Sequence, residues 1–208
     1  MSRLLARRLG FALVDTGAIY RCVALSAVRG GISPDDDTRL RELLGRIRVR
    51  FEVAGEENRV FLDEEDVTSR IRAPEISMAA SAVSSRKVVR EGLLGLQRRL
   101  ALEAPRGAIL EGRDIGTVVF PDADLKFFLG ADESVRARRR YEELFQKGED
   151  RPLEEVLADQ RKRDRDDASR EVAPLKAAGD AVRVDSSALP LSEVVQVLER
   201  AVQGKLGR

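Results

Sequence analysis

Two short apolar runs, Ala108–Leu110 and Leu125–Leu129, enclose a stretch in which Arg113 and Asp114 lie between glycines. Each run is rich in β-prone residues and bounded by chain breakers, so the pattern predicts two neighbouring buried strands. Ligands of a parallel sheet bind beyond the carboxyl ends of its strands. Arg113 carries a planar guanidinium that suits phosphate, and the glycines let a ligand approach the backbone. A surface turn with a salt bridge would explain the Arg-Asp pair alone equally simply, and that alternative stays open here.

The rest of the chain alternates between expected helices and strands. Strand–helix alternation of this kind predicts a three-layer α/β sandwich, in which helices cover both faces of a mainly parallel sheet. Thr16 is predicted to be the N-cap of the helix that follows the first strand. The expected strands cover residues 11–14 and 181–184 besides the two runs above, and the expected helices cover residues 2–9, 18–28, 33–44, 74–104 with a break near 84–85, 134–147, 152–167 and from 190 onward.

One segment departs from this alternation. Residues 48–53 alternate apolar and charged side chains with period two, and residues 59–62 follow across a short polar turn. That spacing predicts an antiparallel hairpin with one exposed face. We expect it to form a small inserted lobe rather than part of the main sheet.

Composition excludes several kinds of chemistry. The 208 residues include a single cysteine, Cys22, and no histidine, which rules out a disulfide framework, a Cys/His zinc site and any histidine-based triad. The net charge of +1 argues against binding a long nucleic acid. No run of eighteen apolar residues exists to span a membrane. The first fourteen residues imitate a twin-arginine signal, but their apolar part is too short, so we expect a cytoplasmic protein.

Four further motifs carry residues suited to phosphate and sugar, and each has a simpler structural explanation. Asp15-Thr16-Gly17 followed by Tyr20-Arg21 is also a capped helix with a surface arginine. The small residues around Ser81, followed by Arg90, are typical of close helix packing. The dense charges of residues 161–170 are typical of a solvated helix. The arginines of residues 136–140 would also suit nucleic acid, although no aromatic side chains accompany them there.

Taken together, these motifs resemble those of bacterial cytidylate kinases. The stretch Glu-Gly-Arg-Asp-Ile-Gly-Thr-Val-Val-Phe-Pro-Asp carries the resemblance most specifically, and the Arg-Asp-x-x-Asp-x-x-Arg run before Val-Ala-Pro-Leu supports it. Ala168 departs from the usual polar continuation of that run. The resemblance implies a single kinase domain over residues 1–208, with a monophosphate-binding lobe at about 32–85 and a helical lid at about 136–173.

The resemblance also implies roles for individual residues. Asp114 would help to position metal or acceptor, Arg163 would approach phosphates, and the metal would have no direct protein ligand. The implied catalytic residues are Arg113, Asp114, Arg136, Arg139 and Arg163; the implied substrate-binding residues are Thr16, Tyr20, Arg21, Ser81, Arg90, Arg113, Asp167 and Arg170; and the implied cofactor-binding residues are Arg139, Arg140 and Ser186.

The implied activity is ATP-dependent phosphorylation of CMP and dCMP with Mg²⁺, by a monomer without nucleic-acid or membrane partners. Such a kinase cradles the donor phosphates with a Gly-x-x-x-x-Gly-Lys loop between its first strand and first helix. No such run occurs in the 208 residues. We therefore expect a truncated start, in which the first central strand and the loop are absent.

Loss of that strand would lower the folding stability by about 1.5–3 kcal/mol for each buried apolar side chain. The alternatives to an active kinase are accordingly a non-catalytic nucleotide-binding relic and, on the basic helices alone, a small RNA-binding protein.

Overall fold

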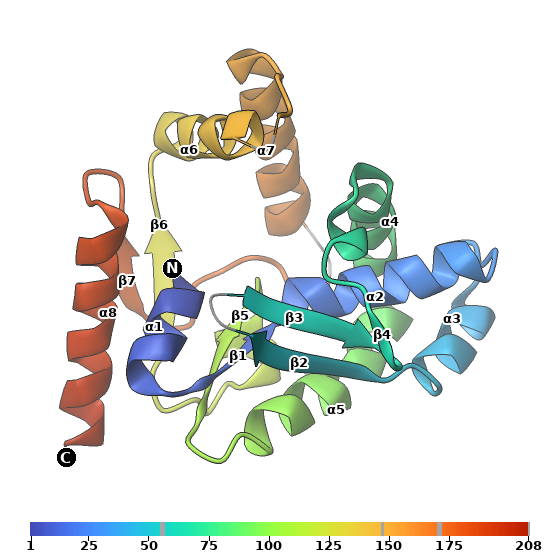
Figure 1. The fold of residues 1–208 in the computed structure, drawn as a ribbon, viewed down its shortest axis with the longest axis horizontal. Helices are drawn as coiled ribbons and strands as arrows, with labels where there is room; N and C mark the ends of the chain where they lie inside the picture. Colours follow the sequence, from blue (N-terminus) through green and yellow to red (C-terminus); the bar gives the residue numbers. More distant parts are fainter. Residues whose placement is uncertain (55–56, 147, 170–171, 208) are drawn as a thin grey trace. The chain divides into compact units, whose positions relative to one another are not determined.

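The computed structural model describes residues 1–54, 57–146, 148–169 and 172–207 (Figure 1). The chain divides into two compact units, one formed by Ser2–Gly112 and the other by Arg113–Arg208 together with Met1. None of the helices in the described part of the chain is long and apolar enough to cross a membrane.

The first unit is built on two parallel strands. Strand β1 pairs with β5 in a register that sets Leu13 opposite Ile109. Gly107 precedes β5 with a φ of +109°, and a Cβ there would lie 3.4 Å from the ring of Phe11, so this turn requires glycine. The elements around the pair are α1 (Ser2–Leu9), β1 (Ala12–Asp15), α2 (Thr16–Arg29), α5 (Lys87–Leu102) and β5 (Ala108–Glu111).

The predicted hairpin is confirmed as a separate antiparallel sheet within the same unit. Strands β2 and β3 pair with Val49 opposite Leu62, and a third short strand, which the sequence pattern did not indicate, adds to β3. The predicted break near residues 84–85 is also confirmed, because α4 ends at Ser84. The elements of this region are α3 (Asp37–Leu44), β2 (Val49–Ala54), β3 (Glu57–Leu62), β4 (Glu65–Asp66), a 3-10 turn (Arg70–Arg72) and α4 (Pro74–Ser84).

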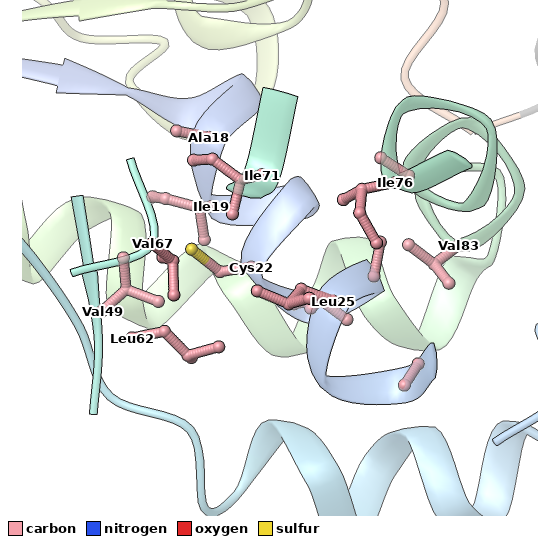
Figure 2. Packing of buried hydrophobic residues seen from close by; sticks show 14 of the residues in the cluster. Ala18, Ile19, Cys22, Leu25, Val49, Leu62, Val67, Ile71, Ile76 and Val83 are labelled. Atoms are coloured by element: carbon pink, nitrogen blue, oxygen red, sulfur yellow. The ribbon is translucent and has the colours of Figure 1, made fainter. Parts of the chain in front are cut away.

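The antiparallel sheet shares one hydrophobic core with α2. Figure 2 shows Val49, Leu62 and Val67 of this region gathered around Cys22, which is fully buried on α2. Burial of an aliphatic side chain contributes roughly 1.5–3 kcal/mol. The insertion is therefore held to α2 mainly by apolar packing.

Two polar contacts reinforce this packing. The Asn58 amide donates to the backbone carbonyl of Leu13 over 3.3 Å, which ties β3 to the free edge of β1. Arg29 at the end of α2 makes two hydrogen bonds of 2.7 and 2.8 Å to the carboxylate of Glu65. That ion pair is exposed, so its contribution is small beside the buried core.

The second unit contains another pair of parallel strands. Strand β6 pairs with β7, with Leu129 opposite Val184. Helix α8 has an apolar face with Val194, Val195 and Leu198 buried. The elements are a π-helical turn (Ile115–Val119), β6 (Phe127–Gly130), α6 (Glu133–Gln146), α7 (Leu153–Ser169), β7 (Val182–Asp185) and α8 (Leu191–Leu206).

The mixed α/β class, with mainly parallel pairing and an antiparallel insertion, is as expected. Strands β5 and β6, however, belong to different sheets, and among the described strands each pairs along one edge only. The expectation that both are buried is also wrong, because all four residues of β5 are half-buried and Leu129 of β6 is 37% exposed. A strand that pairs along one edge is less covered than a strand that pairs along two edges, which is what the prediction assumed.

Candidate functional site

The start of α2 is fixed at the carboxyl ends of β1 and β5. Asp15 caps the helix, since its carboxylate accepts from the Ala18 N–H over 3.0 Å. The prediction that Thr16 is the N-cap is therefore wrong. The Thr16 hydroxyl, only 3% exposed, instead donates to the carbonyl oxygen of Glu111 over 2.7 Å and joins the helix to β5. This bond orients the first turn of α2. Tyr20 and Arg21 follow one turn later on the same helix.

Tyr20 and Arg90 meet between α2 and α5. The guanidinium carbon of Arg90 lies 5.5 Å from the centroid of the Tyr20 ring, within the range of a cation–π contact. Arg90 also donates to the carbonyl of Ser84 over 3.0 Å and is 5% exposed. Arg21 is half-buried beside Tyr20 in the sequence, and Ser81 is exposed on α4. This unit thus presents a buried arginine against an aromatic ring.

In the second unit, Arg113 and Asp167 form an ion pair. The Nε atom of Arg113 lies 2.9 Å from a carboxylate oxygen of Asp167. The Asp167 side chain is 7% exposed, whereas that of Arg113 is 53% exposed. The Asp167 carbonyl also accepts from the Leu175 N–H over 2.8 Å. A buried carboxylate, fixed by its own backbone, therefore holds a guanidinium that remains open to solvent.

Asp114 is buried, and its backbone carbonyl shapes the segment that follows Arg113. It is 6% exposed, and its backbone carbonyl accepts from the N–H groups of Thr117, Val118 and Val119 at 2.9–3.3 Å. These bonds begin the π-helical turn. Arg113 therefore lies immediately before a tightly hydrogen-bonded segment.

The arginines of α6 have partners within the same unit. Arg136 lies 2.7 Å from Asp164 on α7, and Arg140 lies 2.8 Å from Glu143. Arg139 donates to the hydroxyl and carbonyl oxygens of Ser186, at 3.2 and 2.7 Å. Arg136 thus fastens α6 to α7, and Arg139 fastens α6 to the turn before α8.

Two of the predicted site residues remain, Arg163 and Arg170. Arg163 is exposed on α7. Arg170 lies outside the described residues. Within the described ranges, no three His, Cys, Asp or Glu side chains cluster closely enough to hold a metal ion.

Sequence reasoning missed Glu111, a partly buried carboxyl at the end of β5. Burial, followed by the carboxylate of Asp15, raises its pKa above the ordinary 4.5, although a hydrogen bond from the Ser2 side chain acts the other way. Strand register sets Glu111 opposite Asp15, and that juxtaposition was hidden as long as the pairing of the two strands was unknown.

Sequence reasoning also missed Lys126. This lysine is 8% exposed and contacts Asp180 through both carboxylate oxygens. It lies within the run Leu125–Leu129, which was interpreted only as a strand. The one available signal was a charged residue inside an otherwise apolar segment.

Parallel strand pairs, an antiparallel insertion and arginine-rich helices are together consistent with a nucleotide kinase fold. The sequence model of the cytidylate kinase family matches residues 1–203. The chain is 50% identical over 208 residues to a cytidylate kinase of Geobacter sp. (strain M21), covering 100% of this chain and 88% of that protein. It is 51% identical over 203 residues to that of Geobacter sulfurreducens, covering 98% and 86%. The corresponding figures for Aeromonas salmonicida are 44% over 207 residues, 100% and 89%.

The chain therefore belongs to the cytidylate kinase family. This membership confirms the resemblance inferred from the motifs around Arg113, and it implies phosphorylation of CMP.

Proposed function

We propose that this protein transfers a phosphoryl group from ATP to CMP and to dCMP, as a monomer in the cytoplasm. Family membership supports the acceptor, and the pairing of Arg113 with Asp167 is the observation that carries the proposal. A buried carboxylate next to a solvent-open guanidinium offers an acceptor for sugar hydroxyls and a donor for phosphate at one place.

Each unit would carry its own set of acceptor-binding residues. In the proposal, Thr16, Tyr20, Arg21, Ser81 and Arg90 of the first unit contact the nucleoside monophosphate. The guanidinium of Arg113, held by Asp167, would neutralise the phosphate and orient it for in-line attack. Preorganised positive charge of this kind stabilises the transition state, in which negative charge spreads over the transferred group. In the second unit, the acceptor-binding residues would be Asp114, Asp167 and Arg170.

The donor side of the proposal involves the α6–α7 region. Arg136, Arg139, Arg140 and Arg163, with Ser186, would approach the triphosphate as the lid closes and excludes water. Since Arg139 and Arg140 have partners in the structure, closure would exchange these contacts for phosphate oxygens. Mg²⁺ is assigned to the ATP substrate, where it neutralises phosphate charge.

We further propose that the donor phosphates need a glycine-rich loop and a strand that residues 1–208 do not supply. The sequence has no Gly-x-x-x-x-Gly-Lys run. The one-sided pairing of β5 among the described strands gives independent support, because an unpaired edge can accept another strand. Without that loop the chain would bind CMP but not transfer phosphate, which is the relic alternative.

The experiment compares purified 1–208 with a version extended upstream by a strand and a Gly-x-x-x-x-Gly-Lys loop. Coupled assays with Mg-ATP would measure turnover of CMP, dCMP, AMP and GMP, and titration calorimetry would measure CMP binding. We expect turnover of CMP and dCMP by the extended version only. Turnover of AMP comparable to that of CMP would contradict the acceptor assignment. Full activity and cooperative unfolding of 1–208 itself would contradict the proposal on the donor loop.

A further inference from the structure

Lys126 is a buried lysine in the second unit, with contacts at both its ammonium group and its aliphatic stem. It precedes β6 and is 8% exposed. Its ammonium donates to both carboxylate oxygens of Asp180, at 2.9 and 2.7 Å, and to the carbonyl oxygen of Pro121. Asp180 is 64% exposed at its side chain and precedes β7. The lysine thus connects the end of the Arg113–Pro121 segment to the two paired strands.

The aliphatic part of the same side chain packs against Gly116. A Cβ at position 116 would lie 3.0 Å from Cδ and 3.3 Å from Cγ of Lys126, which is too close for an unshifted side chain. The φ of Gly116 lies outside the left-handed region, so the constraint on this position comes from the lysine stem, which an added Cβ would push aside by a few tenths of an ångström. Lys126 therefore contacts the segment twice, at the π-helical turn and at the proline that follows it.

The electrostatics show that this contact is specific. An ammonium group removed from water is strongly destabilising unless its charge and donors are compensated. The carboxylate of Asp180 and the Pro121 carbonyl provide that compensation. The hydrogen bond from Lys126 is also the main cause that lowers the pKa of Asp180 below its usual value, which favours the ionised form of the pair.

The fixed segment is the one that begins with Arg113. The Asp114 carbonyl opens the π-helical turn, Gly116 lies within that turn against Lys126, and Phe120 closes it by donating to the Ile115 carbonyl over 2.7 Å. Arg113 is exposed at its tip, so its direction depends on the backbone that carries it and on Asp167. A displacement of this turn would carry Arg113 with it.

We propose that Lys126 is a positioning residue for the phosphoryl acceptor site. Through Gly116 and Pro121 it fixes the backbone behind Arg113, so that the guanidinium meets the acceptor phosphate. The inference rests on the proposed function, because Arg113 is taken to contact that phosphate. Asp180 is the counter-ion that keeps the buried ammonium in place.

The test uses the version extended upstream by a strand and a Gly-x-x-x-x-Gly-Lys loop. It is a double-mutant cycle between Lys126→Met and Arg113→Ala, with Asp180→Asn as a milder variant. Methionine keeps the apolar stem and removes the charge. Lys205→Met on α8 is the matched control, because Lys205 is exposed and outside the proposed site. We expect Lys126→Met to weaken CMP binding on the order of tenfold, since small misplacements of positioning groups have effects of this size or larger. Asp180→Asn should act in the same direction, and the KM for ATP should change less.

The cycle separates positioning from general stability. If Lys126 acts through Arg113, its substitution should weaken CMP binding little further once Arg113 is alanine. Amide hydrogen exchange provides a readout independent of activity, and we expect faster exchange at residues 115–120 in both variants, with no change in Lys205→Met. An undiminished effect of Lys126→Met in the Arg113→Ala background would overturn the proposal, as would wild-type exchange at residues 115–120. Failure of the extended version without substitutions to phosphorylate CMP would instead contradict the proposed function and leave the exchange result to test the contact.

Discussion

Replacement of Asp167 by asparagine tests the arrangement at the centre of the second unit. The substitution keeps the size of the side chain and removes the charge that holds Arg113 at 2.9 Å. A hydrogen bond to a charged group contributes about 1.5–3 kcal/mol. Because the Arg113 side chain is 53% exposed, water would solvate the released guanidinium, so the loss should fall near about 1.5 kcal/mol. For a chain of this size that corresponds to a decrease in Tm of about 3–6 °C.

The same variant separates two roles of Asp167 in binding. If its carboxylate accepts from the sugar hydroxyls, Asp167→Asn should raise the KM for CMP about tenfold, from the same 1.5 kcal/mol. That increase should be much smaller for 2′,3′-dideoxy-CMP, which lacks the hydroxyls. Equal increases for both nucleotides would mean that Asp167 acts only by holding Arg113.

The assay measures initial rates at saturating Mg-ATP in a protein that contains the donor loop, with differential scanning fluorimetry for Tm. Asp166→Asn is the matched control, because Asp166 is its exposed neighbour on α7. If Asp167→Asn matches Asp166→Asn in Tm and in both KM values, the ion pair contributes neither to stability nor to binding, and the reasoning above is refuted.

Three further results are expected. Thr16→Val should lower stability by about 1–3 kcal/mol, because it leaves the Glu111 carbonyl without its buried donor, whereas Thr16→Ser should not; chemical denaturation measures both. Burial raises the pKa of Glu111, so the proton that Glu111 retains stabilises the fold below pH 4.5, and this stability is lost as the pH rises through the folded pKa. Glu111→Gln should therefore raise the Tm at neutral pH and lose that advantage near pH 4. Burial raises the pKa of Cys22 to about 12, so the native protein should not react with a thiol reagent at pH 8 until denaturant is added.

The sequence was sufficient for features that depend on local pattern. The period-two alternation of residues 48–53 and 59–62 predicted the antiparallel sheet, and the serines at 84 and 85 predicted the boundary between α4 and α5. The Arg-Asp run identified the family because its residue types and spacing are specific over many positions. These signals do not require knowledge of which segments meet in space.

Features that depend on distant partners were not predicted. Asp15 and Thr16 are both good caps, and the choice between them depends on the Glu111 carbonyl, 95 residues from Thr16 in the chain. Similarly, Lys126 and Asp180 are separated by 54 residues, so neither local pattern indicates an ion pair. The π-helical turn was also missed, because the same glycines fit an open loop equally well.

The core shared between α2 and the antiparallel sheet limits how this family could be recombined. Cys22 lies against Val49, Leu62 and Val67, so the insertion and α2 share one apolar core. A chimera that exchanges only β2–β4 with a relative would join two half-cores of different shape. The smallest unit that could be transplanted intact is the insertion together with the inward face of α2, and substitutions on the two sides are expected to covary.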